Sequence, residues 1–270
     1  MNNKNKIVRS VIFVIAIIYM LGVCLWYVMS FINKSDSHSN HNIFSQKDER
    51  YKTIEDPWTL NGIGYNYMCN KDYEKAKPFL FKAAEKNQVN ALNNLGWMYH
   101  YGYGFQQDYK KACEYYERSA NGGHYKAQCN LAHMYEQGLG VKKDYKKAAE
   151  WHEKAVAAGY SPSQLSLGYM YYHGNGVEKD YKKALKLYIL AARQGDEMAM
   201  NNIGWMYHEG HGVEKNYAEA LEFFKSAAER GNPNAMRNLG NMYSKGEGVE
   251  KDLTQAQYWY DRADKADKNS

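Results

Sequence analysis

The chain has 270 residues and a formal net charge of +5 at pH 7. Lys4, Lys6 and Arg9 precede the first apolar run, and without them 32 basic residues stand against 30 acidic ones, a net charge of +2. Because a nucleic-acid-binding protein normally needs a clustered basic face, this balance argues against a nucleic-acid partner.

Residues 1–10 form a short basic tail, and residues 11–32 read VIFVIAIIYMLGVCLWYVMSFI, without a charged side chain. As a helix, this run extends about 33 Å, enough to cross a hydrocarbon core of about 30 Å. It lacks the A-x-A-like site that follows a cleaved signal peptide. Val23 also stands where a lipoprotein signal has a small residue before its cysteine. We therefore predict an uncleaved transmembrane anchor at 11–32.

Flanking charge predicts the orientation of this anchor. The basic tail precedes it, whereas Lys34 and Asp36 nearly cancel each other after it. The positive-inside rule then keeps the N-terminus in the cytoplasm and exports the remainder of the chain. We expect a single-pass protein of the bacterial inner membrane, with a flexible polar linker at 33–55 and residues 56–270 in the periplasm or another extracytoplasmic space.

An eleven-residue sequence, LGYMYYHGNGV at Leu167–Val177, recurs through the exported part. Related sequences in the same 36-residue register begin at Leu95, Leu131, Ile203 and Leu239. A period of this length is typical of solenoids, whose units bury their apolar faces against their neighbours. We predict an all-α solenoid of six helix-turn-helix units over 56–270. The first unit is degenerate, because it lacks the GxGV loop and is four residues short.

Each full unit is predicted to contain two helices, A and B. In the third unit, apolar spacing places helix A at about Ala127–Gln137, and Gly138 and Gly140 then let the chain reverse. Asp144 is the expected N-cap of helix B, and Gly159 is its expected left-handed C-cap.

Glycine recurs in the middle of helix A, although it costs about 1 kcal/mol relative to alanine there. Gly96 and Gly168 are examples, and Ala132 takes this position in the third unit. Close approach of a neighbouring backbone explains a small residue at every copy. We predict that the paired alanines of helix B, such as Ala191 and Ala192, form the other side of this contact.

The combined pattern A-x-x-x-L-G-x-M-Y-x-x-G-x-G-V-x-x-D-Y-x-K-A-x-x-x-Y-x-x-A-A-x-x-G resembles the Sel1-like repeat, a relative of the tetratricopeptide repeat, over about Asp56–Ala266. The resemblance implies a right-handed superhelix of antiparallel helix pairs with the A helices lining its concave face. It also implies an adaptor that binds other proteins. The β-lactam binding of some disulfide-rich Sel1-like proteins is not carried over, because this chain lacks a cysteine pair in each repeat.

Function is expected at helix-A positions that face the concave groove and differ among the units. The candidates for binding a protein or peptide are Asn93, Trp97, His100, Tyr101, His133, Tyr169, Tyr172, His173, Asn201, Trp205, His208 and Arg237. Trp97, Tyr169 and Trp205 are predicted to form an aromatic ladder suited to a protein interface, with asparagines beside it for a peptide backbone. In the alternative interpretation, these rings pack against adjacent A helices and fill the groove.

The sequence contains no S-x-x-K, G-x-S-x-G, H-E-x-x-H, C-x-x-C or P-loop motif, so we predict no catalytic residue, cofactor or small-molecule substrate. His208 and His211 lie at an inter-helix loop, and the pattern predicts no metal site there. Whether Cys113 and Cys129 form a disulfide in an oxidising compartment stays open.

Three functions follow from the sequence as hypotheses. The first is a membrane-tethered adaptor that binds a protein in the solenoid groove. The second is a periplasmic immunity protein that neutralises a secreted toxin. The third, from a different class, is a hydrolase of the β-lactam or amide type, which lacks a supporting motif.

Overall fold

The computed structural model describes residues 53–268. The predicted basic tail at 1–10, the anchor at 11–32 and the linker up to residue 52 lie outside the described residues. Among the helices that are described, none is long and apolar enough to span a bilayer. These helices belong to one compact unit, Asp56–Ser270.

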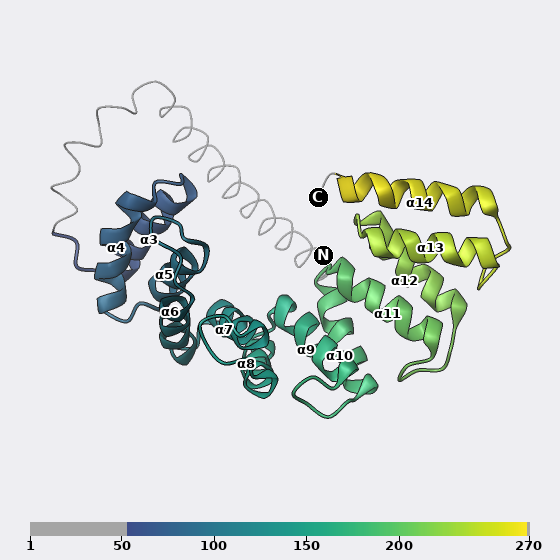
Figure 1. Ribbon diagram of the computed structural model, residues 1–270, viewed down its shortest axis with the longest axis horizontal. Coiled ribbons are helices and arrows are strands. Elements are labelled where there is room, and N and C mark those ends of the chain that lie inside the picture. The colour runs from purple at the N-terminus through teal and green to yellow at the C-terminus, as the bar shows by residue number, and fades with distance from the viewer. Residues whose placement is uncertain (1–52, 269–270) are drawn as a thin grey trace, which may run out of the picture. The chain divides into compact units, whose positions relative to one another are not determined.

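Residues 53–268 contain twelve α-helices and no strand, which confirms the predicted all-α repeat architecture (Figure 1). The A helices, the first of each pair, are α3 (Pro57–Cys69), α5 (Val89–Tyr101), α7 (Tyr125–Gln137), α9 (Ser161–His173), α11 (Glu197–Glu209) and α13 (Pro233–Lys245). The B helices are α4 (Tyr73–Glu85), α6 (Tyr109–Asn121), α8 (Tyr145–Ala157), α10 (Tyr181–Arg193), α12 (Tyr217–Glu229) and α14 (Leu253–Lys268).

The predicted caps set the limits of these helices. The Asp144 carboxylate accepts a hydrogen bond from the Lys147 amide at 3.1 Å, as an N-cap of α8. Ala158 is the C-cap of α8, so the predicted C-cap Gly159 lies one residue beyond it, with φ +78, in the left-handed region that glycine adopts without strain. Helix α7 begins two residues earlier than predicted, because the imidazole of His124 caps it by accepting from the Ala127 amide.

The helix pairs follow one another in chain order from α3–α4 to α13–α14 (Figure 1). Each helix packs on its sequence neighbours, and α3 also contacts α5. Leu131 and Met134 of α7, which are 1% and 0% exposed, pack with Ala112 and Ala120 of α6. The apolar core is therefore shared between successive units along the array.

The mid-helix glycines of α5, α9, α11 and α13 face aromatic rings, whereas Gly64 of α3 faces Leu80, and the predicted alanine partner was wrong. A Cβ added to Gly168 would lie 2.7 Å from the Tyr188 ring, and one added to Gly96 would lie 2.6 Å from the Tyr116 ring. Both tyrosines are buried. The small residue of helix A therefore makes room for a large core side chain of helix B, and not for paired alanines such as Ala191.

Candidate functional site

The twelve predicted groove residues all lie on the A helices α5, α7, α9, α11 and α13, and none of them is buried. Three hollows open on this side of the array, and residues of the A helices make up most of their walls. We call this surface the A-helix face. The predicted residues therefore lie on the helices that line these hollows.

Aromatic rings cluster around Trp97 at the N-terminal end of the A-helix face. The Trp97 centroid lies 4.8 Å from that of Tyr103, 5.3 Å from that of Tyr101 and 6.5 Å from that of Tyr73. The His100 ring stacks on Tyr101 at 4.4 Å. A hollow of about 300 Å³ beside this cluster is lined by Tyr65, Met68, Cys69, Asn93, Asn94 and Trp97.

Tyr169 and Trp205 lie farther along the face, where they line a hollow of about 180 Å³. Tyr169 is 52% exposed and Trp205 is 42% exposed. The His173 ring contacts Tyr169 at 4.1 Å between centroids. Trp97 lines a different hollow from Tyr169 and Trp205, and the ladder of these three rings stays a prediction.

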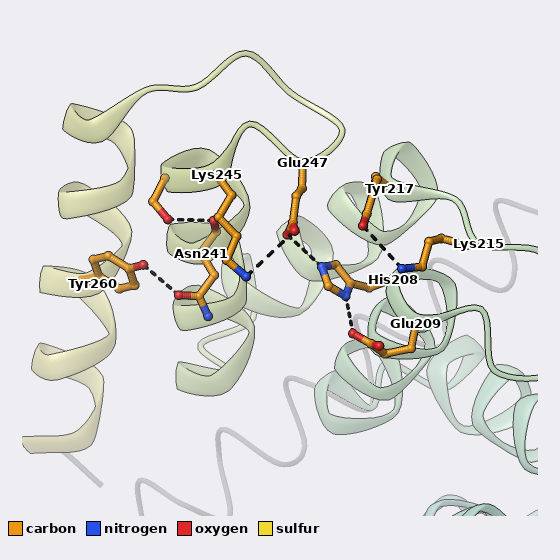
Figure 2. A network of polar contacts seen from close by, with 9 residues as sticks. His208, Glu209, Lys215, Tyr217, Asn241, Lys245, Glu247 and Tyr260 are labelled. Atoms are coloured by element: carbon orange, nitrogen blue, oxygen red, sulfur yellow. Dashed lines mark hydrogen bonds and ion pairs between the residues drawn. The ribbon is translucent and has the colours of Figure 1, made fainter.

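Two of the candidate side chains join successive units. The Tyr172 hydroxyl lies 2.7 Å from Nδ1 of His211, in the loop that follows α11. His208 is bracketed by two carboxylates, with Nδ1 2.7 Å from Glu209 Oε1 and Nε2 2.9 Å from Glu247 Oε2 (Figure 2). Carboxylates only accept hydrogen bonds, so His208 donates to both of them only when both ring nitrogens carry a proton. Tyr172 and His208, on the A helices α9 and α11, therefore connect successive units.

Asparagine amides also link adjacent A helices. In each link, the side-chain Nδ2 of one asparagine donates a hydrogen bond to Oδ1 of another. The pairs, donor first, are Asn94 and Asn61 at 3.1 Å, Asn130 and Asn93 at 3.0 Å, and Asn238 and Asn201 at 2.9 Å. An amide offers two donor protons and an oxygen with two lone pairs, so each asparagine keeps capacity for a further bond. At the far end of the face, the Arg237 guanidinium pairs with Asp267 of α14.

The third unit departs from its neighbours at Ala132, Glu136 and His152, and the fourth unit departs from them at Ser163. His152 occupies the core position of Tyr116 and Tyr188, and Ala132 replaces the glycine opposite it. Ser163 replaces a core alanine of the other units, and Glu136 stands at the position of His100, Tyr172 and His208. Glu136, His152 and Ser163 build a polar cluster where the second and fourth units place a buried tyrosine ring against a glycine.

Short distances connect this cluster. His152 Nδ1 lies 3.1 Å from Ser163 Oγ, and His152 Nε2 lies 3.3 Å from Glu136 Oε1. His133 Nδ1 approaches the other carboxylate oxygen of Glu136 at 3.7 Å. His152 and Ser163 are 1% and 0% exposed, whereas the Glu136 side chain is 16% exposed. The cluster therefore extends from the core to the A-helix face, where Glu136 is partly accessible and the His133 side chain is exposed.

The environment of this cluster favours the charged forms of its members. Burial alone would raise the pKa of Glu136, but pairing with His133 and His152 outweighs it and lowers that pKa to about 2. Burial opposes protonation of His152, but contacts with Cys129 and Glu136 raise its pKa to about 9. An ion pair therefore spans the boundary between core and face near neutral pH.

Glu136 also lines the largest of the three hollows, which has a volume of about 330 Å³. Its other lining residues are Leu165, Ser166, Tyr169, Met198, Asn201, Asn202, Asn232 and Asn234. This set combines one carboxylate, several amides and three apolar or aromatic side chains. It has the chemistry of a site for a ligand that carries both hydrogen-bond donors and apolar groups.

Serine, histidine and carboxylate also occur together in hydrolase triads, but the arrangement here is unlike one. The Ser163 hydroxyl is fully buried, so a substrate carbonyl has no access to it. Within residues 53–268, no group of three or more His, Cys, Asp or Glu side chains is arranged to hold a metal ion. Cys113 and Cys129 are both free thiols.

The Sel1 repeat family model matches the chain six times, at residues 60–88, 89–124, 126–160, 161–196, 197–232 and 233–263. The chain belongs to the Sel1 repeat family. No curated protein sequence matches it.

Solved structures agree with this assignment. A Sel1 repeat protein from Oxalobacter formigenes is 32% identical over 76% of this chain and 85% of that one, with a TM-score of 0.72. The protein c5321, a protective antigen of uropathogenic Escherichia coli strains, is 32% identical over 82% of this chain and 48% of that one, with a TM-score of 0.76. Immunity protein PA5088 from Pseudomonas aeruginosa shares the fold at 20% identity, covering 73% and 75% of the two chains with a TM-score of 0.50.

Several residues of the A-helix face were not among the predicted site residues. Asn94, Asn130 and Asn238 are donors in the amide links, and Asn202 and Met198 line the central hollow. Recurrence of asparagine next to the predicted positions was a signal that could have found the first three. Glu136 was visible only as a variant of a histidine position, because its partner His152 comes from another helix.

Proposed function

We propose that this protein is a membrane-tethered adaptor whose A-helix face binds a protein partner. The observation that carries the proposal is the gathering of exposed Tyr169 and Trp205 with amide groups around hollows on one face. Such aromatic residues combine a large contact area with a polar group and are enriched in the residues that dominate interface energies. Membership of the Sel1 repeat family supports a protein-interaction scaffold.

The membrane part of the proposal rests on the uncharged run at 11–32 and on the basic residues before it. Confinement near a bilayer raises the effective concentration of a partner in the same membrane, so a moderate groove affinity is sufficient. A phosphatase fused to the C-terminus tests this topology. We expect an active periplasmic enzyme, and an inactive one would overturn the proposed orientation.

Site-specific crosslinking tests the binding surface in the full-length chain. A photo-reactive residue is placed at Tyr169 or Trp205, and at exposed Lys186 on α10 as the control. The captured protein is then identified, purified and titrated against the chain. We expect Trp205→Ala to weaken binding at least about tenfold and Lys186→Ala to leave it unchanged. Equal crosslinking from Lys186, or full affinity of a folded Trp205→Ala variant, would show that the partner binds elsewhere.

The other two hypotheses have less support. The immunity proteins among the solved structures share only the fold at their low sequence identity, and a fold is compatible with many functions. A hydrolase would need an accessible nucleophile, and Ser163 beside His152 is buried. We therefore favour a binding role.

A further inference from the structure

The central hollow of the A-helix face contains one charged group. Among the nine residues that line it, Glu136 alone carries a charge, and it comes from α7, while Tyr169 comes from α9 and Asn201 from α11. A ligand in this hollow therefore meets a carboxylate flanked by neutral side chains from the next two units. A carboxylate accepts hydrogen bonds and donates none, so the complementary ligand group is a donor.

The carboxylate is held in place by the cluster behind it. His152 and His133 each approach a different oxygen of Glu136, at 3.3 Å and 3.7 Å. Each carboxylate oxygen has two lone pairs, so both oxygens can accept a further bond from a ligand. His152 does not line the hollow and is 1% exposed, so its charge lies on the core side of Glu136. The site is preorganised, because the carboxylate is already fixed when a ligand arrives.

Apolar surface lies next to the carboxylate. Tyr169 and Met198 both line the hollow, and they are 52% and 51% exposed. An arginine or lysine side chain has a methylene stem that packs on apolar surface and a cationic head that stays polar. Its head can pair with Glu136 and lie over the Tyr169 ring, and both contacts are favourable for a cation. Asn201 and Asn202 add donors and acceptors that suit a peptide backbone.

We propose that the central hollow takes an arginine or lysine side chain from an extended segment of the protein partner, with Glu136 as its counter-ion. The inference rests on the proposed binding role of the A-helix face, and it adds which feature of the partner is recognised. An acidic side chain would be repelled by Glu136, and a purely apolar one would leave the carboxylate desolvated without a donor. A basic side chain complements both the Glu136 carboxylate and the apolar surface of Tyr169 and Met198.

A peptide selection on the purified full-length chain in detergent tests this inference. Random decapeptides displayed on phage are selected, and the best binder is synthesised with its basic residue either intact or replaced by citrulline, the neutral isostere of arginine. We expect the selected peptides to share an arginine or lysine at one position. We also expect citrulline to weaken binding at least about tenfold, because a charge-assisted hydrogen bond is lost.

A matched variant separates recognition from folding. Glu136→Gln alone leaves His152 without its counter-ion in the core, so four positions are instead given the residues that stand 36 positions earlier in the chain. This variant combines Ala132→Gly, Glu136→His, His152→Tyr and Ser163→Ala, and it restores the contact seen between Gly96 and Tyr116. We expect it to melt like the wild type and to bind the arginine and citrulline peptides equally.

The outcomes distinguish this inference from the proposed function. Selected peptides without a shared basic residue would overturn the role of Glu136 as counter-ion, and so would a preference for arginine that persists in the four-residue variant. Either result would leave the A-helix face as the proposed binding surface. Binding that is unaffected by Tyr169→Ala combined with Trp205→Ala would instead remove the A-helix face as the peptide site. If no peptide is enriched, both proposals fail together.

Discussion

His152 and Glu136 form an ion pair between the core of the array and its A-helix face, with Nε2 3.3 Å from Oε1. The imidazole belongs to α8 and is 1% exposed, whereas the carboxylate belongs to α7 and lines the central hollow. The ion pair and the proposed binding of a basic side chain therefore depend on the same carboxylate, Glu136. The contribution of the ion pair to stability can be measured separately from binding. The free energy of unfolding changes when a buried charge loses its partner or when the pH changes its protonation.

Removing the carboxylate should destabilise the third unit. Glu136→Gln leaves a buried imidazolium without its counter-ion, and we expect the free energy of unfolding to fall by about 3 kcal/mol. Equilibrium urea unfolding followed by circular dichroism measures this change. Glu178→Gln, at an exposed loop position, is the control and should change stability by less than about 0.5 kcal/mol. Equal effects of the two substitutions would show that the ion pair does not stabilise the array.

Stability should depend on pH through the same pair. The pKa of Glu136 is lowered from 4.5 to about 2, so its contribution is complete above pH 4.5 and is lost as the pH falls toward 2. The pKa of His152 is raised from 6.5 to about 9, so its contribution is complete below pH 6.5 and is lost as the pH rises through 9. The wild type should therefore be most stabilised by this pair between pH 4.5 and 6.5.

The four-residue variant is the reference against which the dependence of stability on pH is measured. It lacks Glu136 and His152, gains one imidazole through Glu136→His, and keeps His100, His124 and His173, whose pKa values burial lowers in the wild type. Melting temperatures of the two proteins are compared from pH 3 to pH 10. We expect the wild type to lose stability relative to the variant at both ends of this range. Parallel curves would contradict the assignment.

The sequence predicted the scaffold because its signals are local. A 36-residue period, an aspartate such as Asp144 before each B helix and a glycine such as Gly159 after it are sufficient to place helices, caps and turns. The apolar spacing of helix A also identified the face that the candidate residues share. Residues within one helix keep fixed relative positions, so this inference needs no tertiary information.

Contacts between side chains of different helices could not be predicted from the sequence in the same way. Helical spacing shows that Gly168 faces a neighbour but not which side chain meets it, and the answer proved to be Tyr188 in place of an alanine pair. The cluster of Glu136, His152 and Ser163 depends on residues from three helices. Each of them looks like an isolated departure from the repeat until the helices are assembled.

The second glycine of the GxG loop is expected to tolerate no side chain. Gly176 has φ +71, and an added Cβ would lie 2.3 Å from the backbone carbonyl of Tyr145 in the preceding unit. Gly159 has φ +78, but nothing lies within 4 Å of its Cβ position. We expect Gly159→Ala to cost about 1 kcal/mol through backbone strain alone and Gly176→Ala about 2 kcal/mol more through the clash. Urea unfolding of both variants measures the difference, and equal costs would show that the loop does not pack tightly on Tyr145.

The pairing of a small helix-A residue with a large helix-B ring predicts an energetic coupling between Gly168 and Tyr188. Alanine is the better helix former by about 1 kcal/mol, so Gly168→Ala would stabilise an isolated helix. Its Cβ would lie 2.7 Å from the buried Tyr188 ring, however, and we expect a net loss of about 1–2 kcal/mol.

A double-mutant cycle with Tyr188→Ala measures this coupling. Removing the ring creates space, so Gly168→Ala should become stabilising in that background. The natural comparison is the third unit, where Ala132 and His152 take the positions of Gly168 and Tyr188, and Ala132→Gly should cost about 1 kcal/mol through helix propensity. If Gly168→Ala has the same effect with and without the Tyr188 ring, the glycines of the A helices are not retained to accommodate that ring.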